Sequence, residues 1–106
     1  MSFEAKSHVW DGIATIRLRG ELESKSAGRL NRVIEEVATQ ELRRLVLLMD
    51  QLTYLSSAGL RSLVYAHQKL GRGVEIVLVG ARPEVAETIR LTGFDRSVVM
   101  QEPTGA

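Results

Sequence analysis

The chain has 106 residues, of which 44% are hydrophobic and 25% charged, with a formal net charge of +1. This predicts a single domain over residues 1–106, with a core at about 3–100 and a short tail at 101–106. The absence of cysteine excludes disulfide frameworks and thiol catalysis. With no export segment after Met1, no long apolar run and little net charge, we expect a cytoplasmic protein that binds neither nucleic acid nor membranes.

The N-terminal residues have the pattern of a β-hairpin. Residues 3–10 and 13–19 flank Asp11-Gly12, a dipeptide that favours a two-residue type I′ turn. Apolar residues alternate with polar ones over 13–19, so one face of this strand should point into the core. Residues 20–24 then break the alternation, which predicts a loop.

The rest of the chain alternates between helices and strands. Apolar residues at helical spacing predict helices over 25–39, 57–70 and 84–92, with Ser24 or Ser26 as the cap of the first. Continuous apolar runs over 45–49 and 75–79 predict strands covered on both faces, and 98–100 predicts a short last strand. The resulting order, β-β-α-β-α-β-α-β, is typical of an α/β fold in which helices pack around a mixed sheet.

No set of residues in the sequence indicates catalysis. A phosphate-binding loop is absent, and neither His8 nor His67 has a second ligand at metal-binding spacing. The segment 55–59 resembles a nucleophile elbow, but its first position is Leu55 and no histidine follows His67. We therefore expect that the protein is not an enzyme and has no cofactor and no metal.

Ser56 and Ser57 lie where the second helix should begin, after a short loop over residues 50–55. One of them is expected to cap the helix. A phosphate at the same place would be tolerated, because helix N-termini attract anions. The phosphate would then change the binding of a partner, because it adds about −1.5 to −2 units of charge to the surface.

The stretch from Asp50 to Arg61, DQLTYLSSAGLR, resembles the signature of the STAS domain family. Gly20-Glu21-Leu22-Glu23 resembles a second landmark of this family, Gly-x-Leu-Asp before the first helix, and Gly93-Phe94 resembles the usual end of the third helix. The resemblance covers residues 3–100 and implies the same element order as the periodicity does.

Free-standing members of this size are mostly anti-sigma factor antagonists, so the resemblance implies a function. Such proteins bind an anti-sigma factor that is also a serine kinase, and thereby free a sigma factor. The kinase phosphorylates one serine, which corresponds here to Ser57, with Ser56 as the alternative acceptor, and a PP2C-type phosphatase removes the phosphate. The implied partner-binding surface comprises Glu21, Leu22, Glu23, Ser24, Leu55, Ser56, Ser57, Ala58, Gly59 and Arg61.

Other readings of the resemblance remain open. The chain could instead be an accessory subunit of a lipid or anion transporter, in which the second helix is a docking surface and Ser57 only caps it. A small-molecule-binding or sensory module is a third possibility. In the antagonist reading, we expect the unbound protein to be a monomer.

Overall fold

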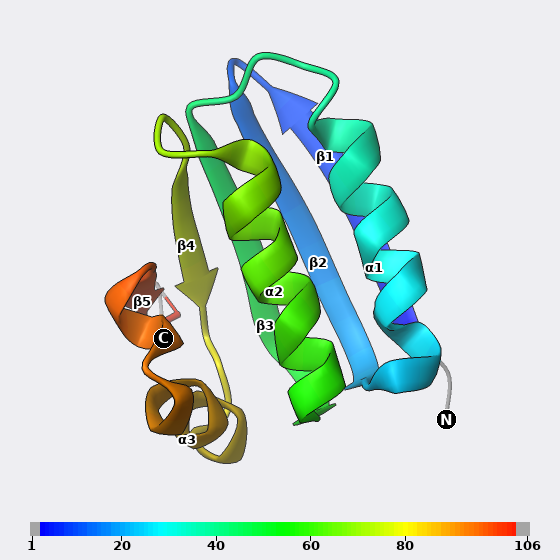
Figure 1. Ribbon diagram of the computed structural model, residues 1–106, viewed down its shortest axis with the longest axis vertical. Coiled ribbons are helices and arrows are strands. Elements are labelled where there is room, and N and C mark those ends of the chain that lie inside the picture. The colour runs from blue at the N-terminus through cyan, green and yellow to red at the C-terminus, as the bar shows by residue number, and fades with distance from the viewer. Residues whose placement is uncertain (1–2, 104–106) are drawn as a thin grey trace.

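The computed structural model describes residues 3–103 and contains, in that part of the chain, one five-stranded sheet with three α-helices. The elements are β1 (Phe3–Trp10), β2 (Ile13–Leu22), α1 (Ser24–Val37), β3 (Arg44–Leu55), α2 (Ser57–Leu70), β4 (Glu75–Val79), α3 (Pro83–Thr92), the 3-10 helix η1 (Phe94–Arg96) and β5 (Val99–Gln101). This arrangement confirms the predicted α/β class and element order (Figure 1).

The strands lie side by side in chain order and form a mixed sheet. β1 pairs with β2 in the antiparallel sense, whereas every later neighbouring pair is parallel. Asp11 and Gly12 have φ values of 54° and 76°, the left-handed conformation that a type I′ turn requires at both positions. The predicted hairpin is therefore confirmed.

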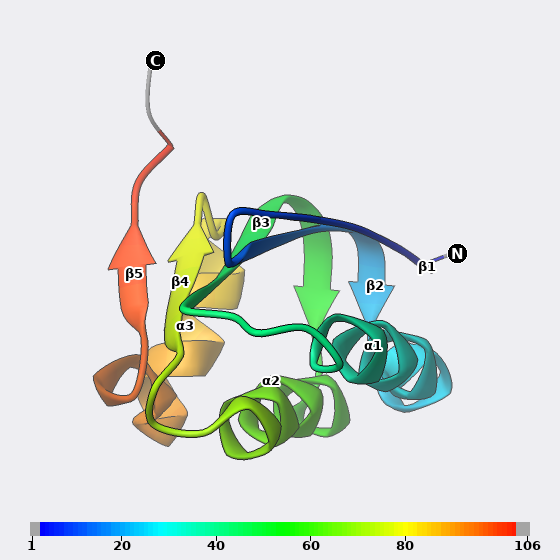
Figure 2. The same ribbon diagram turned by 90° about the horizontal axis from the view of Figure 1, so that it is seen from above.

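α1 and α2 cover one face of the sheet (Figure 2). The core lies between these helices and the inward side chains of the strands. Its fully buried large side chains are Ile16, Leu18, Leu22, Leu30, Ile34, Leu45, Leu47, Met49, Leu52, Leu63, Leu78 and Ile89. Burial of apolar surface on this scale is the main stabilising contribution in a small domain.

The predicted loops over residues 20–24 and 50–55 are wrong in large part, because β2 and β3 continue through them. Gly20 pairs with Leu52, and Leu22 pairs with Leu55. The register shifts between Arg17 and Arg19 and again between Gly20 and Glu21. These irregularities interrupt the inward–outward alternation, which is why the sequence pattern is lost where the strands continue.

Coverage on both faces is confirmed for β4 but not for β3. In β4 three successive residues, Ile76 to Leu78, are buried. In β3 Leu45 and Leu47 are buried, whereas Val46 and Leu48 are only half-buried. Among the described residues, no helix lies over the second face of β1, β2 and β3 (Figure 2).

Several element boundaries differ by one or two residues from those predicted. α1 begins at Ser24, with Glu23 rather than Ser24 or Ser26 at the N-cap position. α2 and β4 have the predicted bounds, and Gly93 ends α3 at a φ of 81°. β5 includes Gln101, the first residue of the predicted tail, and residues 104–106 of that tail lie outside the described part of the chain.

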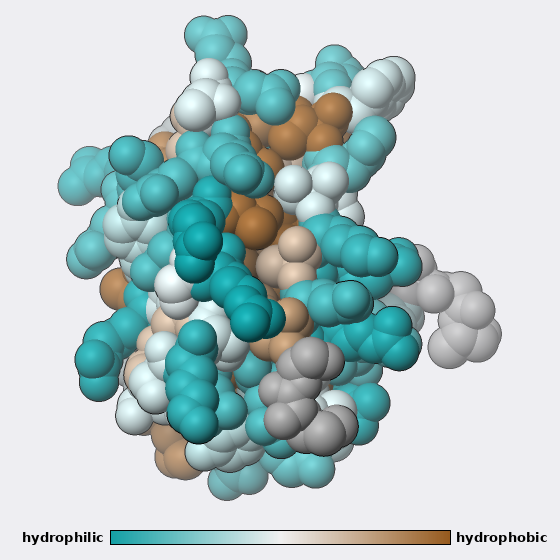
Figure 3. Space-filling model, turned by 90° about the vertical axis from the view of Figure 1, so that its right-hand side faces the viewer, coloured by the Kyte–Doolittle hydropathy of each residue, from teal (hydrophilic) through white to brown (hydrophobic). Residues whose placement is uncertain are grey.

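One side of the molecule is formed by α1 and the edge strand β1. There hydrophilic side chains surround a narrow apolar strip (Figure 3). Ala5, Val9 and Val33 are partly buried against the core. No helix within residues 3–103 is long and apolar enough to cross a membrane.

Candidate functional site

The carboxyl ends of β2 and β3 lie together with the N-terminal ends of α1 and α2, at the lower end of Figure 1. Glu21 pairs with Tyr54 in the sheet, and the backbone N–H of Ser56 donates to the carbonyl of Leu22 at 3.0 Å. The two sequence segments that resemble family landmarks, 20–23 and 50–61, are thus adjacent in space.

Gly59 sets how closely α2 approaches β2. A Cβ atom at this position would lie 2.3 Å from the carbonyl oxygen of Leu22 and 2.8 Å from its carbonyl carbon. Both contacts are far shorter than van der Waals distance, and both involve backbone that cannot rotate away. The glycine therefore allows the first turn of α2 to pack directly on the end of β2.

The two serines have different environments. Ser56 is the N-cap of α2, is half-buried, and its Oγ accepts a hydrogen bond from the backbone N–H of Gly59 at 3.1 Å. Ser57 is the first helical residue and is exposed. At this end of α2 the helix dipole and the first-turn amides favour negative charge.

Ser26 holds the backbone of residues 21–23, which we call the acidic segment. Its hydroxyl donates to the carbonyl of Glu21 at 2.8 Å and accepts from the backbone N–H of Glu23 at 3.0 Å. Ser26 is itself buried, so these two hydrogen bonds are shielded from water. The two hydrogen bonds hold the chain in place between β2 and α1. In this segment Glu21 and Glu23 are half-buried and Ser24 is exposed.

The predicted surface residues divide into two groups. Leu22, Leu55 and Gly59 are buried, so they position the backbone and do not present side chains to solvent. The remaining members are exposed or half-buried: Glu21, Glu23, Ser24, Ser56, Ser57, Ala58 and Arg61.

Tyr54 is a surface residue that the sequence analysis missed. It is 52% exposed and lies across from Glu21 at the end of β3. The only signal in the sequence is that Thr53 and Tyr54 stand between two leucines, Leu52 and Leu55, that are buried. This signal becomes readable once residues 50–55 are known to be a strand.

Contacts between α1 and α2 hold the two helices in place. The hydroxyl of Tyr65 donates to a Glu35 carboxylate oxygen at 2.7 Å, and Ser62 Oγ donates to the carbonyl of Ala27 at 3.3 Å. The hydrogen bond to Glu35, with smaller contributions from desolvation and from the charge of that carboxylate, raises the pKa of Tyr65 above 10.0. These two hydrogen bonds join the middle of α2 to α1.

The site offers an exposed hydroxyl, two carboxylates and a helix N-terminus, groups suited to recognition and modification. Within residues 3–103, no cluster of three or more histidine, aspartate or glutamate side chains is placed to hold a metal ion.

Two bacterial proteins are similar to this chain in sequence. Anti-sigma-F factor antagonist RsfB of Mycobacterium tuberculosis is 28% identical over 87 residues, which cover 82% of this chain and 71% of that protein. BtrV of Bordetella bronchiseptica is 33% identical over 85 residues, covering 79% and 73%.

Two solved structures have a fold similar to that of this chain. An anti-sigma factor antagonist from Mycobacterium paratuberculosis superposes with a TM-score of 0.85 at 26% identity, covering 94% of this chain and 86% of that one. The anti-sigma factor antagonist SpoIIAA in its unphosphorylated form gives 0.80 at 20% identity, with coverage of 98% and 90%. The family model described as STAS domain matches residues 4–105. The chain therefore belongs to the STAS domain family, as its sequence landmarks predicted.

Proposed function

We propose that this protein is an anti-sigma factor antagonist that is switched off by phosphorylation at Ser57. In its unphosphorylated form it binds an anti-sigma factor that is also a serine kinase, and a sigma factor is released. A PP2C-type phosphatase restores the binding form. The protein itself acts as a binding partner and kinase substrate rather than as an enzyme.

The exposure of Ser57 beside the acidic segment is the observation that carries this proposal. Ser57 is exposed at the first position of α2, next to Ser56, whose backbone N–H donates to the carbonyl of Leu22 in the middle of the acidic segment. A kinase brings its own catalytic groups, so the substrate only has to present the hydroxyl. The names of RsfB and of the Mycobacterium paratuberculosis structure support the antagonist function.

The contacts of the two serines favour Ser57 over Ser56 as the acceptor. Ser56 Oγ already caps α2 through Gly59, and its side chain is half-buried. To phosphorylate Ser56, the kinase would have to draw this oxygen out of the cap, which costs about 1 kcal/mol of helix stability. Ser57 makes the hydroxyl available without unwinding the helix.

The switch acts through surface charge. A phosphate on Ser57 adds about −1.5 to −2 units of charge next to the two carboxylates of the acidic segment. The N-terminal end of α2 stabilises that charge locally, so the fold is kept. A partner surface that is complementary to Glu21 and Glu23 then meets an altered charge pattern, and like-charge contacts across an interface cost several kcal/mol.

Binding to the cognate anti-sigma kinase tests the proposal. We expect Ser57→Glu to bind at least about tenfold more weakly than the unmodified protein, a loss of roughly 1.4 kcal/mol. Ser97→Glu is the matched control, since Ser97 is also exposed and lies near the opposite end of α2, beside Gly71. We expect its affinity to be unchanged.

Two results would contradict the switch. One is equal affinity for Ser57→Glu and the unmodified protein. The other is an equal loss in Ser57→Glu and Ser97→Glu, because it would mean that net charge matters and position does not. Addition of a PP2C-type phosphatase to the phosphorylated protein should restore binding.

A further inference from the structure

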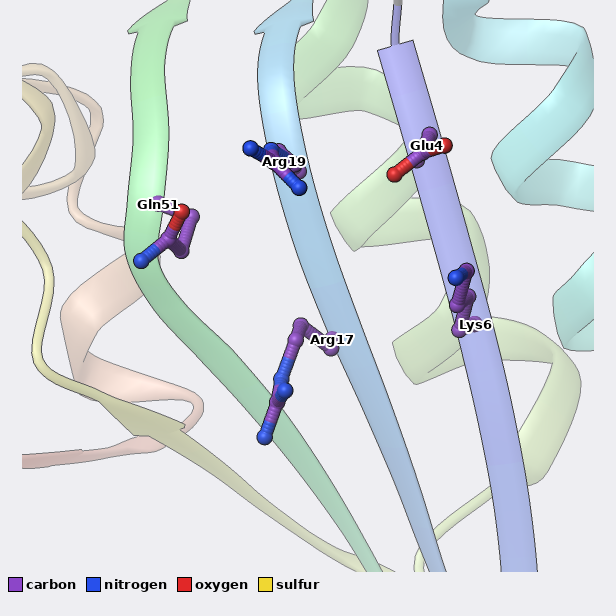
Figure 4. A pocket seen from close by; sticks show the side chains of 5 residues that line it. All are labelled: Glu4, Lys6, Arg17, Arg19 and Gln51. Carbon is purple, nitrogen blue, oxygen red and sulfur yellow. The ribbon is translucent and has the colours of Figure 1, made fainter.

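The uncovered face of the sheet carries a group of basic side chains. A pocket of about 270 Å³ on this face is lined by Glu4, Lys6, Arg17, Arg19 and Gln51. These side chains come from three neighbouring strands, and Arg17 reaches from β2 toward β3 (Figure 4). We call Lys6, Arg17 and Arg19 the cationic cluster. With Glu4 as the one carboxylate among the lining residues, the pocket has a net charge of +2, although the whole chain carries only +1.

The protein offsets the charge of the cationic cluster only in part, because Glu4 is the direct cross-strand partner of Arg19 and supplies one negative charge against three positive ones. Within residues 3–103, ion pairs join Arg43 to Asp11 and Arg44 to Glu75, and neither involves the cluster. Lys6 is moreover the direct cross-strand partner of Arg17. Like charges in this arrangement destabilise a sheet, and a bound anion would relieve the repulsion.

The excess positive charge on this face centres on Lys6 and Arg17, which line two of its pockets. A neighbouring pocket of about 420 Å³ shares Glu4 and Arg19 with the first, adds Glu21 and Arg82, and is not lined by Lys6 or Arg17, so its charges balance. On the other side, a pocket of about 190 Å³ shares Lys6 and Arg17 with the first and adds the half-buried Leu48. Lys6 and Arg17 therefore lie outside the pocket that contains Glu21, whereas Arg19 lines both pockets, and the apolar side chain of Leu48 lies beside Lys6 and Arg17.

We propose that the cationic cluster binds an extended acidic segment of a partner protein. Arg17 and Arg19 are alternate residues of one strand, so they are spaced by roughly 6.6–6.8 Å along it. Alternate side chains of an extended peptide have the same spacing, so two of its carboxylates would face the two guanidinium groups. Arg suits such pairs because its planar fork matches a carboxylate.

The shape of the surface favours a peptide over a small ligand. Sites for small molecules are concave and mostly apolar. Here the lining side chains are polar, and Glu4, Lys6, Arg17, Arg19 and Gln51 are all exposed. Such a surface forms many charge contacts but does not enclose a ligand, so binding of a peptide should be fast and sensitive to salt. The proposal does not depend on phosphorylation at Ser57.

Nuclear magnetic resonance can test this with the isotope-labelled protein. The probe is a short peptide in which glutamate alternates with serine, and the control probe has glutamine in place of glutamate. We expect the glutamate peptide to shift the amide signals of residues around Lys6, Arg17 and Arg19, and the shifts to fade as salt is added. The glutamine peptide should leave them unchanged.

Variants decide whether the position of the charges matters. The double variant Arg17→Gln/Arg19→Gln should bind the glutamate peptide about tenfold more weakly. Arg32→Gln/Arg72→Gln removes the same charge from two exposed arginines outside the cluster and should bind normally. The melting temperature of Arg17→Gln should equal or exceed that of the unmodified protein, because the repulsion with Lys6 is removed.

Each opposite result would overturn the proposal. Equal losses in the two double variants would reduce the binding to general charge attraction. Stronger shifts with inorganic phosphate or single-stranded DNA than with the glutamate peptide, at equal ionic strength, would assign the cluster to a different ligand. Absence of any amide shift at low salt would refute peptide binding at the cationic cluster.

Discussion

Replacing Gly59 by alanine should destabilise the protein at the junction on which the site is built. The added methyl group would lie 2.3 Å from the Leu22 carbonyl oxygen, whereas real Cβ contacts essentially never fall under 3.0 Å. The first turn of α2 must then move away from β2 by at least 0.7 Å, the difference between these two distances. This movement stretches the hydrogen bond from the Ser56 N–H to the Leu22 carbonyl, now 3.0 Å long.

Three contributions set the size of the effect. Overpacking of this kind costs about 1–3 kcal/mol. A lost backbone hydrogen bond costs about 1 kcal/mol, and the better helix propensity of alanine returns about 1 kcal/mol. The free energy of unfolding should fall by about 2 kcal/mol, which corresponds to a melting temperature lower by roughly 8–16 °C in a domain of this size.

Thermal and urea unfolding, followed by circular dichroism, measure this change. Gly28→Ala is the matched control, because Gly28 lies in α1 and a Cβ there would meet nothing within 4 Å. That control should be more stable by about 0.5–1 kcal/mol. If Gly59→Ala were as stable as Gly28→Ala, the close approach of α2 to β2 would be refuted as the reason for glycine at this position.

Three further predictions concern the site and the core. Ser56→Ala should lower the free energy of unfolding by about 1 kcal/mol through loss of the cap, whereas Ser57→Ala should change it by less than about 0.5 kcal/mol; urea unfolding distinguishes them. Glu35→Gln should lower the pKa of Tyr65 back toward 10.0, which a titration followed by tyrosine absorbance measures. In the unmodified protein, this hydrogen bond stabilises the fold below pH 10.0, and the stabilisation is lost as the pH rises through the raised pKa of Tyr65. Leu47→Ala, at a side chain with 0% exposure, should cost about 2–5 kcal/mol in the same unfolding assay.

Local signals in the sequence predicted much of the fold. Asp11-Gly12 determines the hairpin because few other residues accept positive φ at both turn positions. The bounds of α2 follow from a serine before its first turn and Gly71 after its last. The alternation of apolar runs with amphipathic helices was enough for the order of the elements.

Features that depend on partners distant in the chain were missed. Residues 50–55 continue β3 because β2 continues beside them, and the shifted register hides the strand pattern in both segments. The uncovered face beside Val46 and Leu48 depends on where the helices pack, which a short apolar run does not encode. The 3-10 helix η1 after α3 had no signal that we recognised.

In the candidate site, too, local features were predicted and features that depend on distant contacts were missed. The sequence placed Ser56 and Ser57 at the start of a helix, but only the hydrogen bond from Gly59 distinguishes the cap from the exposed residue. Glu23 at the N-cap was not expected, since glutamate is not among the preferred capping residues. Its position depends on Ser26, whose hydroxyl bridges two backbone groups.

The most direct test of the proposed switch is intact-mass measurement with site mapping after incubation with ATP and the serine-kinase anti-sigma factor of the same genome. The proposal predicts a gain of one phosphate on Ser57, no gain in Ser57→Ala, and loss of kinase binding by the phosphorylated protein. A phosphate on Ser56, or stable binding without any phosphate, would contradict the switch at Ser57. Absence of both phosphate and binding would contradict the antagonist function itself.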